Sequence, residues 1–354
     1  MSKLFSPLQL RETVFKNRIF VSPMCQYSAV DGLANGWHFV NLGSRAIGGA
    51  AMVMAEATGI SPEGRITPHC LGIWSDDHVD ALQPIVEFIK QQQAIPGIQI
   101  AHAGRKGSCD VPWKGSVYLS PDEGGWQTLA PSAIPLTPNH AAPKALALAE
   151  IDTIITQFVT AAHRALEAGF EVIELHCAHG YLLNEFLSPL TNKRKDRYGG
   201  SLENRCRLPL TIAKAIRDFW PQDKPVFVRI SATDWVEGGW DITQSIQLAK
   251  WLKEIGVDFI DCSSGGLMLD AKIPAAPGYQ TTFASRIRTE VGIPTGAVGM
   301  ISAPAQAEHI LVTEQADAVL LARELLRDPY WPLHAAGELH VDIEWPLQYA
   351  RAKP

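Results

Sequence analysis

The segment ELHCAHGYL, residues 174–182, places two histidines and a tyrosine directly after an apolar run that is typical of a buried strand. Imidazole and phenol groups at the end of a core strand each need a hydrogen-bond partner, so His176, His179 and Tyr181 mark a candidate active site. The spacing His-x-x-His also fits a zinc pair. Zinc is the weaker interpretation, because residues three apart on a straight strand point to opposite faces and no third ligand stands out in the segment.

Residue types that can do chemistry also follow the other apolar runs of the chain. At the carboxyl ends of these runs the sequence is SPMCQY (22–27), EAT (56–58), QIAHAGR (99–105), RIS (229–231), SSGG (263–266), GAVG (296–299) and AR (322–323). The beginnings of the same runs are mostly apolar or plain turn residues. Because the carboxyl ends of the strands form the working face of a parallel barrel, this one-sided distribution predicts an active site at that face.

Eight apolar runs could form the strands that carry these residues. Most are too apolar for a strand with one solvated face, which favours a parallel sheet covered by helices. Eight strand–helix units in 354 residues predict an α/β protein with a single (β/α)₈ barrel. A doubly wound sheet is the alternative, but it normally has a glycine-rich turn after its first strand, and SPMCQY has none. The expected strands are 17–24, 50–57, 97–104, 170–176, 225–231, 257–264, 293–300 and 316–323, and the clearest helices are 77–93, 149–168, 202–220, 242–255 and 304–313.

The connection between the third and fourth strands is unusually long. Residues 105–147 are rich in proline, glycine and tryptophan and have no clear periodicity. They form either a plain surface loop or, because they leave a strand at the working face, a lid or pocket wall.

Composition narrows the class of protein. A net charge of −6 without a basic run argues against nucleic acid or an anionic membrane as the main partner. The first residues lack the pattern of a signal peptide, and no apolar run is long enough to cross a bilayer. Six scattered cysteines with no CxxC pair predict neither a disulfide framework nor a structural zinc site, and a cytoplasmic location fits them.

The last two strand ends suggest a phosphate-binding site. Glycine amides after the seventh and eighth strands of a barrel often bind phosphate, and Arg323 adds a cation that can bind it through two hydrogen bonds. No GxGxxG motif follows a strand and no P-loop motif occurs, so a separate nucleotide-binding domain is not expected.

Many of these stretches together closely resemble the Old Yellow Enzyme family, and more narrowly its thermophilic-like (class III) bacterial branch of FMN-dependent ene-reductases, NADPH dehydrogenases and xenobiotic reductases. The resemblance runs from NRIFVSPM to QYARAKP. Its most specific part is the block HGYLLNEFLSP followed by DRYGGS; SPMCQY, GIQIAHAGRK, FVRISATD, GAVGMI and LARELLRDP add to it.

The resemblance implies one FMN-binding barrel domain over residues 1–354, with a tightly but non-covalently bound FMN that NADPH reduces and an activated alkene reoxidises. The alkene is an enone, a maleimide or a nitroalkene. Arg229 would lie near the flavin N1 and C2 oxygen, and the family's usual glycine before the phosphate-binding arginine is replaced here by Ala322. The matching FMN contacts are Ser22, Pro23, Met24, Cys25, Ala57, Gln99, Arg229, Gly299, Ala322 and Arg323.

The resemblance also assigns the catalytic residues. His176 and His179 would bind the activating oxygen of the alkene, where negative charge develops. Tyr181 would protonate the α-carbon, and Tyr27 would close the pocket from the first strand. Cys25 is by default a buried, inert cysteine, but the resemblance implies a thiol beside the flavin. We expect a salt-bridged structural role for Glu174 and helix-face packing for Trp37 and His38.

The tail, residues 340–354, resembles that of the same branch, in which an arginine reaches the active site of a neighbouring subunit. Arg351 is the matching residue, and the resemblance therefore implies a homo-oligomer, either a dimer or a tetramer. The alternative is a disordered basic end.

Three other functions compete with this assignment. An iron–sulfur flavin reductase would carry a run of cysteines after the barrel, and the chain has none. A metal- or Schiff-base-dependent barrel lyase would use His176 and His179 as ligands or a lysine at a strand end, but no strand ends in lysine and Lys106 belongs to a loop. A non-catalytic FMN store would have no need of Tyr181 and the histidine pair.

Overall fold

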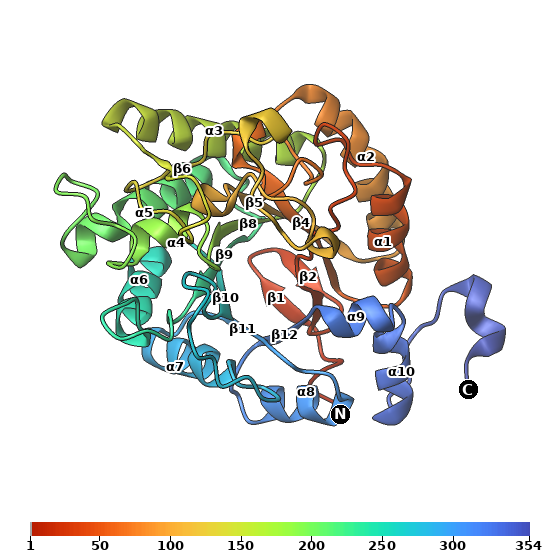
Figure 1. The fold of residues 1–354 in the computed structure, drawn as a ribbon. Coiled ribbons are helices and arrows are strands. Elements are labelled where there is room, and N and C mark those ends of the chain that lie inside the picture. The colour runs from red at the N-terminus through yellow and green to blue at the C-terminus, as the bar shows by residue number, and fades with distance from the viewer. Residues whose placement is uncertain (1) are drawn as a thin grey trace.

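Eight parallel strands close into a barrel in the computed structural model, which describes residues 2–354 (Figure 1). The predicted (β/α)₈ barrel is therefore confirmed and the doubly wound alternative is wrong. Each strand begins and ends within a few residues of the predicted run, except that the outermost residues of the shorter strands are irregular. In chain order the barrel strands are β3 (Ile19–Val21), β4 (Met52–Gly59), β5 (Ile95–Ala101), β8 (Val172–Cys177), β9 (Val226–Ser231), β10 (Phe259–Ser263), β11 (Thr295–Val298) and β12 (Ala318–Leu321).

The helices surround the barrel because each has one apolar face. Several begin at a side chain that accepts from the backbone of the first turn, as Asn35 does for α1 and Asp241 for α6, which satisfies amides that the helix leaves free. The five predicted helices are all present. The helices are α1 (Gly36–Ile47), α2 (Asp76–Gln91), α3 (Leu148–Glu167), α4 (Leu182–Leu187), α5 (Leu202–Phe219), α6 (Ile242–Glu254), α7 (Thr281–Val291), α8 (Pro304–Val312), α9 (Arg323–Arg327) and α10 (Trp331–Glu338).

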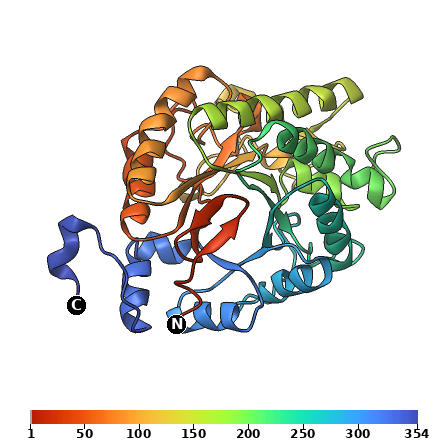
Figure 2. The same ribbon diagram turned by 180° about the vertical axis from the view of Figure 1, so that it is seen from behind.

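A hairpin that the sequence did not predict closes the amino end of the barrel. Its strands, β1 (Leu8–Leu10) and β2 (Thr13–Phe15), lie across the barrel in Figure 2. Phe15 of the hairpin contacts Phe20 at 4.8 Å between ring centroids, and Phe227 stacks on Phe259 at 4.4 Å. These fully buried rings fill the half of the barrel interior that lies towards the amino ends of the strands, so this end is a packed core without a channel.

The long connection after β5 is ordered against the carboxyl end of the barrel. Residues 105–147 contain the 3₁₀ turns η2 (Gly104–Lys106), η3 (Pro112–Lys114) and η4 (Pro121–Glu123), and two short paired strands, β6 (Leu129–Ala130) and β7 (Lys144–Ala145). No helix among residues 2–354 is both long and apolar enough to cross a membrane.

Candidate active site

The carboxyl end of β8 brings the two histidines and the tyrosine together, as the sequence predicted. The ring of His176 lies 5.2 Å from the ring of His179 and 5.0 Å from the ring of Tyr181, and both pairs are close to perpendicular. The three side chains are therefore grouped at the carboxyl end of β8.

The backbone after β8 turns sharply to produce this arrangement. His179 and Gly180 have φ values of 61° and 73°, in the left-handed region that a β-carbon disfavours. A β-carbon at Gly180 would overlap the carbonyl oxygen of Gly266 in the loop after β10, so only glycine fits. The turn is held because the Gly180 amide donates to Oδ1 of Asn184 at 2.8 Å and the His179 amide donates to Oγ of Ser231 at 2.9 Å.

His176 is neutral and has a free N–H group. Burial, together with the nearby positive charge of Arg229, holds the pKa of His176 well below its usual range. Its Nδ1 accepts from the Ala178 amide at 3.2 Å, which places the proton on Nε2. Nε2 has no hydrogen-bond partner among residues 2–354, so it can donate to a ligand.

His179 is also neutral, and a neighbouring serine selects its tautomer. Burial and Arg229 lower the pKa of His179 well below its usual range. Its Nε2 lies 2.7 Å from Oγ of Ser263, whereas that hydroxyl is 3.4 Å from Oε1 of Gln280, which already accepts from Ser264 at 2.6 Å. The shorter contact favours donation from Ser263 to Nε2, and His179 then carries its proton on Nδ1.

Tyr181 is protonated and lies beside a cation. Burial raises the pKa of the Tyr181 phenol well above its usual range. The ammonium group of Lys106 lies 5.2 Å from the centroid of the Tyr181 ring. The site thus combines a protonated phenol with a positive charge on one of its faces.

The segment after β3 contacts the long connection. Tyr27 has a φ of 50° and its ring contacts Trp113 of the long connection at 6.0 Å. Residues 105–147 therefore pack against the segment that holds Tyr27, and the lid or pocket wall stays a prediction. Cys25 is half-buried, and loss of contact with water raises the pKa of its thiol and keeps it protonated, while its place beside the flavin stays a prediction.

A buried polar cluster lies inside the barrel below these residues. Nε2 of Gln99 donates to Oε1 of Glu174 at 2.7 Å, and Arg229 pairs with Asp261 at 3.1 Å and donates to Oγ of Ser22 at 3.0 Å. Burial raises the pKa of Glu174 to about 8 and that of Asp261 to about 6. The predicted salt bridge of Glu174 is wrong: among the described residues its partner is the amide of Gln99, because Asp261 occupies the guanidinium.

A bulge in β4 exposes Ala57 to this cluster. Ala55 pairs with Ile98 and Ala57 with Gln99, so Glu56 is the extra residue. Glu56 turns outward, where it accepts from the Gln26 amide and lies 3.5 Å from Nε2 of His38. His38 is buried, as predicted for helix packing. Trp37 is 59% exposed, so the same prediction is wrong for Trp37.

The residues of the predicted phosphate site lie at the ends of β11 and β12. Gly299 has a φ of 116°, which a residue with a β-carbon disfavours, and a β-carbon there would overlap the Gln280 side chain. Because the residue is glycine, a ligand can approach its backbone. Arg323 is exposed at the start of α9 and makes no ion pair or side-chain hydrogen bond with another described residue. Ala322 has a φ of −109°, so its backbone is not in the left-handed region that favours glycine.

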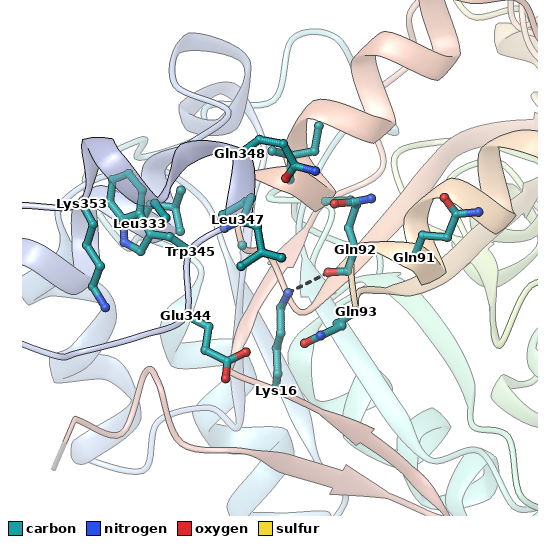
Figure 3. A pocket seen from close by; sticks show the side chains of 15 residues that line it. Lys16, Gln91, Gln92, Gln93, Leu333, Glu344, Trp345, Leu347, Gln348 and Lys353 are labelled. Atoms are coloured by element: carbon teal, nitrogen blue, oxygen red, sulfur yellow. Dashed lines mark hydrogen bonds between the residues drawn. The ribbon is translucent and has the colours of Figure 1, made fainter.

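Arg351 is far from these residues along the surface of its own chain. It lies in η5 (Leu347–Ala352), in the C-terminal segment that stands off the barrel in both views (Figures 1 and 2). Between this segment and the ends of α1 and α2 lies a cleft of about 700 Å³, in which Nζ of Lys16 donates to the carbonyl of Gln92 at 3.2 Å (Figure 3). This cleft is at the amino-end rim of the barrel and contains none of the predicted site residues.

The structure adds site residues that the sequence analysis missed. The sequence analysis assigns Lys106 to a loop and gives it no role at the site, but its Nζ donates to the carbonyl of His179 at 2.8 Å. Its position directly after a strand end was the available signal. Ser263 and Asp261 come from β10, and only the closed barrel brings them beside β8 and β9. Within residues 2–354, no group of three or more His, Cys, Asp or Glu side chains is placed to hold a metal ion.

Comparison with known proteins finds relatives of this chain in sequence and in structure. Residues 3–342 match the model of the NADH:flavin oxidoreductase / NADH oxidase family. An NADPH dehydrogenase of Geobacillus thermodenitrificans is 48% identical over 350 residues, which cover 98% of both chains. Morphinone reductase superposes with a TM-score of 0.80 at 27% identity, covering 98% of this chain and 91% of that one. An old yellow enzyme homologue from Zymomonas mobilis superposes with a TM-score of 0.79 at 26% identity, covering 99% of each chain.

Proposed function

Since the chain belongs to the NADH:flavin oxidoreductase / NADH oxidase family, to which the Old Yellow Enzymes belong, we propose that it is an ene-reductase that uses NADPH to reduce activated alkenes. That it is a flavin-dependent NAD(P)H oxidoreductase with FMN as cofactor follows from the family itself. The proposal concerns the acceptor, which is an enone, maleimide or nitroalkene, and the residues that act on it.

The residues at the barrel mouth fit FMN. Arg323 has no partner among the described residues and suits a phosphate, and Gly299 keeps the neighbouring backbone accessible. Ala57, Gln99 and Arg229 offer an apolar contact, an amide and a cation at the barrel interior, which suit the pyrimidine edge of the ring. The segment Ser22–Cys25 would lie along another edge. When bound, FMN supplies hydride transfer between NADPH and the alkene.

The chain's own residues then act on the alkene. His176 Nε2 and His179 Nδ1 donate to the carbonyl or nitro oxygen, which gains negative charge as the β-carbon receives hydride. Tyr181 gives its proton to the α-carbon, and a new C–H bond replaces its O–H bond. Tyr27 limits the pocket from the side of β3.

One observation carries the proposal: at the carboxyl end of β8 the neutral ring of His176 lies 5.2 Å from the neutral ring of His179 and 5.0 Å from the protonated phenol of Tyr181. Electron transfer to a flavin alone does not require this set. A substrate that gains charge on oxygen and a proton on carbon does require it.

The C-terminal segment supports a second part of the proposal, that the enzyme is a homo-oligomer. Leu347 is 89% exposed in this segment, and Trp37 and Val40 of α1 are 59% and 67% exposed beside the Tyr27 segment. A neighbouring subunit would cover these apolar side chains and bring its Arg351 to the site.

All six cysteines are free and unpaired, which supports the proposed cytoplasmic location.

The visible spectrum of the purified protein tests the acceptor. Without oxygen, NADPH should bleach the flavin absorption, and an added enone, maleimide or nitroalkene should restore it within seconds. Restoration by oxygen but by no alkene would contradict the ene-reductase proposal while leaving the flavin oxidoreductase intact.

Mixing two inactive variants tests the shared site. Tyr181→Phe and Arg351→Ala subunits, unfolded and refolded together, should regain about a quarter to a half of the wild-type alkene activity if Arg351 acts on its neighbour. No recovery, with a monomer in sedimentation, would contradict the homo-oligomer.

A further inference from the structure

Lys106 places its ammonium group against the turn after β8 that carries Tyr181. Its Nζ donates to two backbone carbonyls, that of His179 at 2.8 Å and that of Gly266 at 2.9 Å. The first belongs to the turn after β8 and the second to the loop after β10. Lys106 itself follows β5, so a single ammonium group joins three loops that are far apart in the sequence.

The two joined loops are in unusually close backbone contact. A β-carbon on Gly180 would overlap the carbonyl of Gly266, and one on Gly266 would lie 2.7 Å from Cα of His179. Two glycines therefore allow the contact, but glycines do not hold it, since each adds flexibility. Besides the hydrogen bonds to Asn184 and Ser231, those from Lys106 add a constraint that ties the turn carrying Tyr181 to the loop after β10.

The same ammonium group lies over the ring of Tyr181. A cation 5.2 Å from the ring centroid is attracted to the face of a phenol. It is attracted far more strongly to a phenolate, and a phenolate is what Tyr181 becomes when its O–H bond breaks and its proton forms the C–H bond at the α-carbon. Solvent then returns a proton to the phenolate oxygen.

We propose that Lys106 is a positioning residue for the proton donor: it fixes the turn that carries Tyr181 and stabilises the charge that Tyr181 acquires on giving up its proton. The inference rests on the proposed alkene reduction.

The groups around Lys106 make its charge titratable near neutral pH. Loss of water contact lowers the pKa of Lys106 to about 8, against the opposing effect of the Glu185 carboxyl. Lys106 is therefore charged below about pH 8 and neutral above it, and its effect on Tyr181 should fade as the pH rises. The titratable or charged groups that face it are Glu185 from α4, Arg105 and Cys109 from its own loop, and His176, His179 and Tyr181 from the end of β8.

Three variants test this in the flavin-loaded enzyme. Lys106→Met removes the charge and the hydrogen bonds, Lys106→Arg keeps a charge that does not titrate, and Lys114→Met removes an exposed lysine of the same connection as a control. We measure reduction by NADPH and reoxidation by an enone separately, by stopped flow between about pH 6 and pH 10.

The wild-type enzyme should reoxidise more slowly as the pH rises through about 8. Lys106→Met should reoxidise about tenfold more slowly at pH 7 and lose the dependence near pH 8, with NADPH reduction changed less than about twofold. Lys106→Arg should stay within about threefold of wild type and also lose that dependence, since guanidinium does not titrate there. An unchanged pH profile in Lys106→Met, or equal slowing of both half-reactions, would overturn the inference.

Hydrogen exchange separates this inference from the proposed function, because it needs no alkene. Backbone amides of residues 178–183 should exchange about tenfold faster in Lys106→Met than in wild type, and at the wild-type rate in Lys106→Arg and Lys114→Met. Equal exchange in all four proteins would overturn the role of Lys106 in fixing the turn. A wild-type enzyme that no alkene reoxidises would instead overturn the proposed function, with the exchange result still standing.

Discussion

The two ends of the barrel are built from opposite kinds of side chain. At the amino end, Phe15 of the hairpin and Phe20, Phe227 and Phe259 of the strands form a cluster with almost no exposed surface and no polar atoms. At the carboxyl end, Glu174 and Asp261 each bury an oxygen that has no hydrogen-bond partner among the described residues. An orphaned buried oxygen costs stability, whereas a packed aromatic ring contributes it.

Backbone strain, by contrast, occurs at both ends. Tyr27 and His179 have positive φ values after barrel strands on the carboxyl side, and Arg11 in the hairpin and Gln93 before β5 have them at the amino end. The contrast between the two ends therefore lies in their side chains: packed rings stabilise the amino end, and buried polar groups reduce stability at the carboxyl end. The amino end fixes the strands, and the carboxyl end can then hold polar groups in positions that would be unfavourable by themselves.

The largest expected effect is on stability. Phe15→Ala should destabilise the protein by about 3–5 kcal/mol, because it leaves a cavity among packed rings, and should leave the turnover of the folded enzyme unchanged. Denaturant unfolding and steady-state kinetics measure the two quantities. Val14→Ala, on the exposed face of the same hairpin strand, is the control. Loss of turnover in the folded Phe15 variant would show that the two ends are not independent.

Tyr181→Phe should have the opposite pattern. Removing the general acid should slow flavin reoxidation by an enone by roughly a hundredfold, while reduction by NADPH and the unfolding free energy change little. Anaerobic stopped flow resolves the two half-reactions. If reoxidation by the enone keeps its wild-type rate, Tyr181 is not the proton donor.

Glu174→Gln should change how the stability of the protein depends on pH, because it removes a buried group that ionises. The pKa of Glu174 is raised to about 8, so the folded protein binds this proton more tightly than the unfolded chain does. The protonated Glu174 side chain therefore contributes to the free energy of unfolding at low pH, and this contribution is lost as the pH rises towards about 8. The variant, which keeps an acceptor for Gln99, should gain melting temperature relative to wild type as the pH increases from about 5 to about 9. A pH-independent difference would mean that Glu174 is ionised throughout.

Ala322→Gly should have the smallest effect. Because the φ of Ala322 is −109°, its backbone is not in the left-handed region that favours glycine, and restoring the family's glycine should change the dissociation constant of FMN by less than about threefold. Quenching of FMN fluorescence on titration with apoprotein measures that constant. Binding that tightens tenfold or more would show that the methyl group obstructs the phosphate.

The sequence predicted some site residues and missed others for an identifiable reason. His176, His179 and Tyr181 lie within six residues of one another, so their grouping was visible in a single segment. Ser263 and Asp261 lie more than 80 residues away from that segment, in β10, and their contacts with His179 and Arg229 exist only because the strands close into a barrel. Glu174 shows the same limit, since its burial was predictable but its partner was not.

The sequence alone determined the barrel and its working face. Eight apolar runs at regular spacing, each followed by polar residues, are local patterns that any chain with this fold must carry. Three features depend on the tertiary structure alone. They are the packing of the hairpin across the amino end, the tautomer of His179 that its contact with Ser263 favours, and the contacts of Lys106 with two loops. These depend on distances between segments that are distant in the chain, and no local pattern of residues encodes such a distance.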